Sequence, residues 1–265
     1  MKLTILCDNN TFIDSYLIGE PAFSCYIENE GEKILFDVGY SDVFSFNAKK
    51  RNINLKEVDK IVLSHGHDDH THGLKHFKFN KKTNLYYCKG CFDPKKIDDI
   101  DLTAPFSEEK MGKMFNLVCV DKVTEVSPNL YCLGPIPRVL DFEKDNPKLK
   151  TLQNGKWVQD HVYDDTALVY NGKNGLAIFT ACSHSGVCNI IEYAKKTFGK
   201  NVDLLIGGFH MFDINEQCLE TIKYFKKQKI KHLYPCHCTS LLVKGEMMKQ
   251  GLTIEEVGSG LEIMI

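Results

Sequence analysis

The chain has 265 residues, of which 43% are hydrophobic and 26% are charged, and its formal net charge is −2. This composition is that of a globular protein with a buried core, and the charge balance argues against a nucleic-acid-binding or membrane-surface protein. Apolar runs are too short for a membrane span, and the N-terminal apolar stretch is too short for a signal peptide. The sequence therefore predicts a cytoplasmic location.

The N-terminal half predicts short strands joined by tight turns. Apolar runs of strand length lie at 3–7, 23–28, 33–39, 60–65 and 84–88. The stretch "CYIENEGEKILFD" has Glu-Gly between two such runs, which predicts a β-hairpin. Residues 92–160 show weak periodicity and contain most of the prolines, so we predict long functional loops there.

The C-terminal third alternates strand and helix patterns. Strands are expected at 167–170, 176–182, 203–208 and 232–237, and amphipathic helices at 185–199 and 215–229. This alternation is typical of a layered α/β protein. We predict a single domain over residues 1–265, with two sheets packed face to face and helices outside.

The stretch "IVLSHGHDDHTHGL" places H-x-H-x-D-H directly after a predicted strand. Residues two apart in an extended turn point the same way, so His65 and His67 can bind one ion. Asp69 and His70 follow the bend and can face a second ion. Imidazole and carboxylate ligands suit zinc, iron or manganese. The alternative is a solvated loop that happens to be rich in histidine.

Three more histidines follow predicted strands: His184 in "FTACSHSG", His237 in "YPCHCT" and His210 in "IGGFH". The first two are candidate metal ligands. His210 is either a ligand or a substrate contact, because the glycines before it could equally mark close backbone packing. Arg138 in "IPRVLDFE" is either an anion anchor for the substrate or part of a surface salt bridge.

Eleven cysteines without framework-like spacing are expected to be reduced thiols. Cys88 and Cys91 have the spacing of half a zinc or redox site. Because no second C-x-x-C completes it, we interpret this pair as structural or incidental.

The motifs "FSCYIENEGEKILFDVG", "LSHGHDDH", "DDTALVY", "TACSHSGVCNIIEYA" and "YPCHCT" together resemble the metallo-β-lactamase superfamily. Within it, they are similar to the branch of the dihydropterin–ribofuranosylaminobenzene-phosphate synthases and related metallo-hydrolases. The resemblance spans nearly the whole chain. It implies an αββα sandwich with a metal site at the edge between the sheets.

The resemblance also implies a ligand set, with Asp37 bracing the metal loop. The first ion would be held by His65, His67 and His184, and the second by Asp69, His70 and His237. The chain departs from the superfamily at Cys182, which stands where an aspartate usually bridges both metals. Cys182 is therefore a further candidate ligand, and the second ion is expected to be held less securely than the first.

The predicted function is metal-dependent hydrolysis of a small molecule. Two divalent ions, with zinc as the leading candidate and iron or manganese as alternatives, would activate a shared hydroxide. Asp69 would orient that hydroxide and take up its proton. The alternatives are a dihydropterin–ribofuranosylaminobenzene-phosphate synthase-type transferase, a di-iron redox protein and a metal-binding protein without catalysis. Neither a nucleic acid nor a membrane is expected as a partner.

Overall fold

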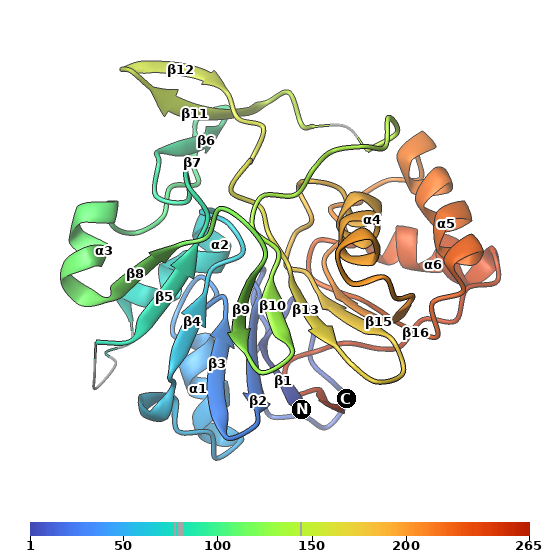
Figure 1. Cartoon of the computed structure of the whole chain (residues 1–265), viewed down its shortest axis with the longest axis horizontal. Coiled ribbons are helices and arrows are strands. Elements are labelled where there is room, and N and C mark those ends of the chain that lie inside the picture. Colours follow the sequence, from blue (N-terminus) through green and yellow to red (C-terminus); the bar gives the residue numbers. More distant parts are fainter. Residues whose placement is uncertain (77, 79–81, 144) are drawn as a thin grey trace.

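The computed structural model describes residues 1–76, 78, 82–143 and 145–265, and it places most strands in two sheets that pack face to face (Figure 1). The first sheet has seven strands, in the order β17 (Glu262–Met264), β1 (Lys2–Cys7), β2 (Ser24–Asn29), β3 (Glu32–Phe36), β4 (Lys60–Val62), β5 (Asn84–Tyr87) and β8 (Asn116–Cys119). The second has six, in the order β16 (His232–Pro235), β15 (Val202–Gly207), β14 (Leu176–Phe179), β13 (Leu168–Asn171), β10 (Leu130–Cys132) and β9 (Thr124–Ser127).

The predicted hairpin is confirmed as β2 and β3, which pair antiparallel with Asn29 opposite Glu32. The two turn residues, Glu30 and Gly31, both have positive φ, at 49° and 83°. Two-residue turns of this kind match the twist of the flanking strands, and glycine adopts positive φ without steric cost.

Each sheet contains a parallel section. β3, β4, β5 and β8 run parallel to one another in the first sheet, as do β14, β15 and β16 in the second. Loops that leave the carboxyl ends of parallel strands gather at one edge of a sheet. The histidine-containing segments predicted from the sequence all follow such strand ends, so the fold carries them to the sheet edges.

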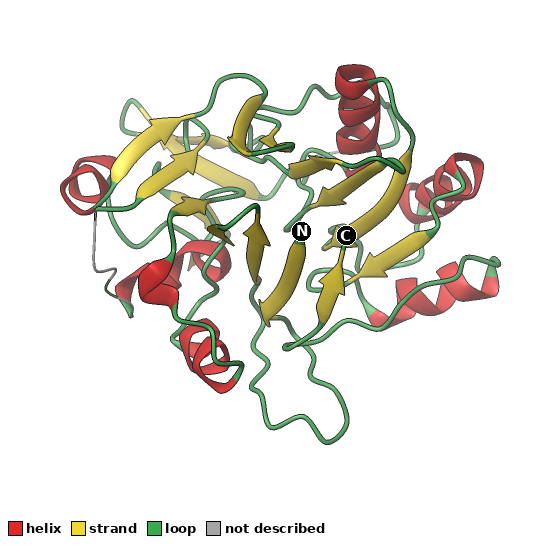
Figure 2. Cartoon of the chain, turned by 60° about the horizontal axis from the view of Figure 1, so that its bottom comes forward, coloured by secondary structure: helices red, strands yellow, loops and turns green. Residues whose placement is uncertain are grey.

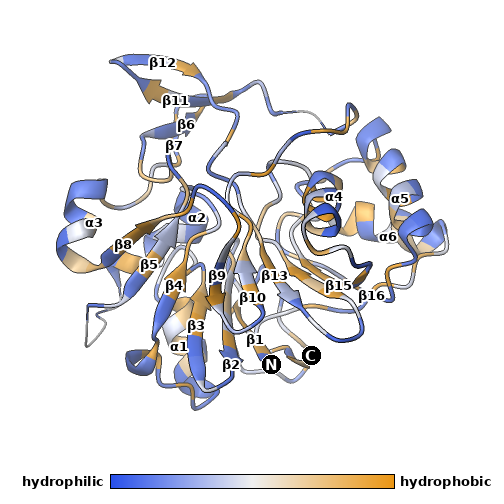
Figure 3. Cartoon of the chain, in the orientation of Figure 1, coloured by the Kyte–Doolittle hydropathy of each residue, from blue (hydrophilic) through white to orange (hydrophobic). Residues whose placement is uncertain are grey.

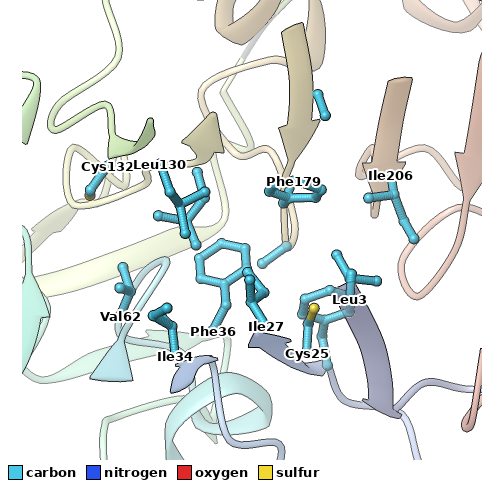
Figure 4. Packing of buried hydrophobic residues seen from close by; sticks show 14 of the residues in the cluster. Leu3, Cys25, Ile27, Ile34, Phe36, Val62, Leu130, Cys132, Phe179 and Ile206 are labelled. Atoms are coloured by element: carbon cyan, nitrogen blue, oxygen red, sulfur yellow. The ribbon is translucent and has the colours of Figure 1, made fainter. Parts of the chain in front are cut away.

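A hydrophobic core lies between the two sheets. Ile27, Ile34 and Phe36 of the first sheet face Leu130 and Phe179 of the second, and all five are completely or almost completely buried (Figure 4). Burying one such side chain contributes roughly 1.5–3 kcal/mol. These inward-facing residues join the sheets into a sandwich.

Helices cover both outer faces of this sandwich (Figure 2). α1 (Val43–Lys50) and α3 (Glu108–Met114) pack on the first sheet, and α4 (Val187–Phe198), α5 (Glu216–Gln228) and α6 (Leu241–Lys249) pack on the second. The remaining helical turns are α2 (Asp68–Thr71), η1 (Leu55–Glu57) and η2 (His72–Lys75). The predicted α/β class and the αββα layering are therefore confirmed.

The two predicted C-terminal helices are also confirmed, because α4 and α5 lie within the expected ranges. α4 buries Ile190, Ile191 and Ala194 and ends at Gly199, which has the left-handed conformation of a helix C-cap. In Figure 3 the strands carry much of the hydrophobic colour, whereas the outer helices are largely hydrophilic. This distribution is that of amphipathic helices covering a buried sheet.

The prediction of long loops over residues 92–160 was wrong in part. This segment contributes α3, β8, β9 and β10, and it also forms all four strands of a separate sheet at the top of Figure 1. That sheet has the order β12 (Lys156–Gln159), β11 (Leu149–Gln153), β6 (Lys95–Ile97) and β7 (Ile100–Asp101). Its strands are short, and β12 is exposed throughout, so they lack the hydrophobic periodicity that reveals a strand.

The two ends of the chain lie side by side, since the Met1 amino group donates to the Ile265 carbonyl oxygen at 3.0 Å and β1 pairs with β17. None of the helices in the described ranges combines the length and the hydrophobicity needed to cross a membrane.

Candidate metal centre

The loop after β4 carries the H-x-H-x-D-H segment and is held tightly against its surroundings. Gly66 separates His65 from His67, and a Cβ at this position would lie 1.8 Å from the carbonyl oxygen of Cys91. The Gly66 amide donates to Asp164 Oδ2 at 2.8 Å. The loop therefore requires glycine between the two histidines, and the turn after Cys88 packs directly beneath it.

His65, His67 and His184 form the first group of donors. His65 Nε2 and His67 Nδ1 lie 3.0 Å apart, and the His184 ring centroid lies 4.7 Å from the centroid of each of the other two rings. Nε2 of His184 is buried and has no hydrogen-bond partner among the described residues. An unpartnered buried nitrogen is costly unless something binds it, and a metal ion would do so.

A second group joins Asp69, His70, Cys182 and His237. Cys182 Sγ lies 3.3 Å from His70 Nε2 and 3.2 Å from His237 Nε2. Asp69 Oδ2 lies 3.4 Å and 3.3 Å from the same two nitrogens. Ligands at 2.0–2.3 Å around a tetrahedral ion are spaced about 3.3–3.7 Å apart, so these separations are close to those of a four-coordinate site.

Cys182 is common to both groups, because its sulfur also lies within 4.8 Å of ligand atoms of His65 and His184. The sulfur thus occupies a position from which it can contact both candidate ions. The sequence comparison left its role open, and the geometry places it among the donors.

Asp37 orients two of the histidines. Its Oδ2 accepts hydrogen bonds from His70 Nδ1 at 2.8 Å and from Ser64 Oγ at 2.6 Å. Ser64 Oγ lies 2.9 Å from His65 Nδ1, and since the hydroxyl proton goes to Asp37, the imidazole must donate this hydrogen bond. Neutral His65 and His70 therefore both keep an unprotonated Nε2 directed at the candidate centre.

Asn9 orients the ring of His237 in the way that Asp37 orients the ring of His70, because Asn9 Oδ1 accepts a hydrogen bond from His237 Nδ1 at 3.1 Å. The backbone amide of His237 donates to Asp8 Oδ1 at 2.8 Å. Both partners come from the loop after β1, so the first and last thirds of the chain meet at the site.

Several residues of the centre have strained backbone. Asp37, His210 and His237 have φ of 55°, 49° and 47°. Non-glycine residues rarely adopt positive φ, and such strain is concentrated at functional sites. Here the sharp turns bring the side chains back toward one point at the sheet edges.

Burial and charge affect the histidines of the two groups in opposite ways. Burial lowers the pKa of His65 and His184 well below 6.5 and that of His67 to about 3. Burial opposes the charged form of His70 as well, but the carboxylates of Asp69 and Asp37 outweigh it and raise the pKa of His70 well above 6.5.

This difference predicts that the two ions respond differently to pH. The neutral histidines of the first group bind an ion without releasing a proton, so its affinity should be nearly constant between about pH 6 and pH 8. His70 is protonated in the metal-free protein below its raised pKa, so the second ion must displace a proton. Its affinity should therefore fall as the pH falls, by at least about tenfold for each pH unit, because His237 and the Cys182 thiol, whose pKa values are also raised, must lose protons as well. Competition titrations with a chromophoric chelator measure both affinities. Equal pH dependence of the two ions would contradict the prediction.

Cys182 provides a second prediction. One thiolate sulfur cannot bridge two ions with separate atoms, as a carboxylate can, so the second ion should bind more weakly than the first. Cys182→Asp should preserve or tighten the binding of the second ion, and Cys182→Ser should weaken the binding of that ion. Calorimetric zinc titration of the wild type and both variants tests this. Two equally tight sites that neither substitution changes would show that Cys182 takes no part.

A cavity of about 420 Å³ opens above the two groups. Its lining comes from both halves of the sandwich and from the loop after β7, and it consists of Asn9, Pro21, His67, Asp68, Asp69, Leu102, Cys182, His184, His210, Phe212, His237, Cys238 and Ser240. Five of the candidate ligands, namely His67, Asp69, Cys182, His184 and His237, therefore line a space that could admit a small molecule, and His65 and His70 lie completely buried behind them.

The two predicted substrate contacts differ in their placement. His210 lines the cavity and packs its ring on His184, with 4.3 Å between centroids. Arg138 is not among the described residues that line it. Its Nε lies 3.2 Å from Asp145 Oδ1, and its guanidinium also donates to the His161 carbonyl oxygen. The structure thus shows the salt-bridge alternative for Arg138.

Sequence reasoning missed Lys95, Asp160 and Asp164. Lys95 is 2% exposed, and its Nζ lies 3.1 Å from Asp160 Oδ2 and 2.9 Å from Asp164 Oδ1. Through Asp164, which accepts from Gly66, this buried charge cluster links the small four-stranded sheet to the metal loop. No periodic pattern or motif connects residues so far apart, so only their folded positions reveal the cluster.

A fold of two sheets between helices, with clustered histidines at the sheet edges, is the architecture of a metal-dependent enzyme. The family model of the metallo-beta-lactamase superfamily matches residues 17–95. The chain is 32% identical over 247 residues to the 7,8-dihydropterin-6-methyl-4-(beta-D-ribofuranosyl)-aminobenzene-5'-phosphate synthase of Methanocaldococcus jannaschii. The aligned region covers 86% of this chain and 83% of the relative. An uncharacterized protein of the same organism is also 32% identical, over 89% of this chain and 90% of its own.

A solved structure described as a metal-dependent hydrolase of the beta-lactamase superfamily superimposes with a TM-score of 0.88. It is 27% identical, and the match covers 100% of this chain and 99% of the other. The chain belongs to the metallo-β-lactamase superfamily, as its sequence motifs predicted.

Proposed function

We propose that the protein is a metal-dependent hydrolase that acts on a small molecule in the cavity above His67 and His237. The observation that carries the proposal is the pair of buried donor groups that share Cys182 and face this cavity. His65, His67 and His184 would hold one divalent ion. Asp69, His70, His237 and Cys182 would hold another.

Two divalent ions, when bound, supply Lewis acidity and lower the pKa of a water molecule, which makes a nucleophile available near neutral pH. The residues supply position and proton transfer. Burial alone would raise the pKa of Asp69, but the charges and hydrogen bonds of His70 and His237 lower it well below its usual value. Asp69 is thus ionised and lines the cavity, where it can orient the attacking water by accepting a hydrogen bond from it. The lowered pKa makes Asp69 a weak base, so it would hold the proton of the water only transiently.

The cavity also favours a substrate with an apolar part. Pro21 and Leu102 contribute apolar surface, and the ring of Phe212 is 54% exposed at this site. Asp68 and Ser240 add polar groups that could fix orientation. Small-molecule sites commonly combine an apolar lining with a few polar contacts.

The test begins with elemental analysis of protein purified without added metal. We expect close to two transition-metal ions per chain, with zinc as the leading candidate. A panel of phosphoester, lactone and pterin substrates then follows, with metal-stripped protein as the control. Hydrolysis that metal removal abolishes and reconstitution restores would support the proposal. Failure to bind any transition metal after reconstitution would overturn it.

A second candidate function rests on the 32% identity to the methanogen synthase. A transferase of that type would join a dihydropterin that carries a leaving group on its 6-methyl carbon to a ribofuranosylaminobenzene 5'-phosphate, and the leaving group would be released as the new bond forms. The two candidates are distinguished by incubating the metal-loaded protein with both compounds and identifying the product by mass spectrometry. A joined product would favour the synthase, whereas hydrolysis of a panel substrate without joining would favour the hydrolase.

A further inference from the structure

A third group of donors lies beside the two already described. The sulfur atoms of Cys182 and Cys238 and a ring nitrogen of His210 all lie within 4.8 Å of one another. All three residues line the same cavity. Neither the hydrolase nor the synthase proposal uses Cys238, and neither assigns His210 to an ion, although the sequence left it open as a ligand or a substrate contact.

The fold brings Cys238 and His210 together through the loops after β15 and β16. Met211 and Thr239 form a parallel bridge between these loops, and the Phe209 amide donates to Thr239 Oγ1 at 3.0 Å. The sulfur of Cys238 fits against Gly208, where a Cβ would lie 2.4 Å from it. Because Gly208 has no side chain, the Cys238 thiol can pack directly against the backbone at this position.

The imidazole of His210 is positioned by ring contacts and retains a free nitrogen. Its ring packs on His184 and on Phe212, with centroid separations of 4.3 Å and 5.0 Å. Nδ1 is buried, and it has no hydrogen-bond partner in the part of the chain that the structure describes. The backbone amide of His210 donates to Cys238 Sγ at 3.3 Å, which holds the sulfur next to the ring. A buried nitrogen beside two sulfurs is suited to binding a cation.

Two thiolates and one imidazole differ in chemistry from the histidine and carboxylate donors deeper in the site. Three protein ligands of this kind suit zinc, with a fourth position open to solvent or substrate. Thiolate sulfur also favours soft ions over the hard ions that carboxylates bind. The position at the cavity lining would leave such an ion accessible.

We propose that Cys182, His210 and Cys238 form a third, thiolate-rich site for a divalent ion at the cavity wall. Cys182 is common to all three donor groups and would be shared with the ions already described, so this third ion binds after the other two and more weakly. The proposal does not depend on which reaction the protein catalyses. It adds a metal site to those that the superfamily resemblance implies.

Cobalt(II) tests the site, because thiolate ligands to this ion absorb in the near ultraviolet. Metal-stripped, fully reduced protein is titrated with cobalt, and bound ions are counted by elemental analysis. The wild type should bind a third equivalent that adds near-ultraviolet absorbance. Cys238→Ser should weaken this third equivalent by about tenfold or more and remove its absorbance, while the first two equivalents remain. His210→Ala provides a second variant with the same expected result if Cys238→Ser does not fold.

Cys119→Ser is the matched control, because Cys119 is an exposed thiol on β8 outside the cluster. It should bind cobalt like the wild type. Saturation of the wild type at two equivalents would overturn the third site while leaving the dinuclear proposal intact. A third equivalent that persists in both Cys238→Ser and His210→Ala would also overturn it. Binding of no cobalt at all would overturn both proposals.

Discussion

Replacing His67 by alanine is expected to remove one of the two ions and to lower kcat/KM for any substrate found in the panel by about three orders of magnitude. His67 is buried, and its Nδ1 lies 3.0 Å from His65 Nε2, so alanine removes a donor that no neighbour replaces. A catalytic ion typically contributes several kcal/mol of transition-state stabilisation, and each 1.36 kcal/mol corresponds to a tenfold change in rate.

Elemental analysis should give one ion per chain in His67→Ala and two in the wild type. His232→Ala is the matched control, since His232 is exposed at the start of β16 and does not line the cavity. His67→Ala should keep the far-ultraviolet circular dichroism of the wild type, which would show that it is folded. Retention of both ions and full activity in His67→Ala would contradict the assignment of His67 as a ligand.

Lys95→Met is expected to have the largest effect on stability. Burial opposes the charge on Lys95, but Asp164 and Asp160 raise its pKa above the ordinary value, so the ammonium is present throughout the physiological range. Removing it leaves two carboxylates that are 2% and 5% exposed without a counter-charge. Breaking a buried ion pair in this way costs about 3–5 kcal/mol. The Tm should therefore fall by roughly 6–20 °C.

Differential scanning fluorimetry or calorimetry measures this shift. Lys96→Met is the matched control, because Lys96 is the next residue in β6 but is less buried than Lys95, and its ammonium lies over the Trp157 ring. This substitution should change the Tm little. The variant Lys95→Met combined with Asp160→Asn and Asp164→Asn should recover part of the loss, since it also removes the unpaired charges. A Tm for Lys95→Met that matches the control would show that the cluster contributes nothing to stability.

Local sequence patterns were sufficient for most of the sandwich. The apolar runs that predicted strands correspond to β1 to β5 and β13 to β16, and the two amphipathic patterns correspond to α4 and α5. These patterns are informative because one face of each strand or helix must be buried, which leaves a period in the sequence. The short strands β6, β7, β11 and β12 have no such period, and the sequence predicted loops there.

The sequence alone determined which residue types gather at strand ends and hence that a metal site was expected. Only the tertiary structure decided which of these residues meet. Cys182 lies 112 residues from His70 and 55 from His237 along the chain, yet its sulfur contacts both. The tertiary fold also placed Cys238 beside His210, buried Lys95 between two aspartates and paired Arg138 with Asp145. Local periodicity records which face of an element is buried, whereas contacts between distant loops depend on how the sheets dock, and no short stretch of sequence encodes that.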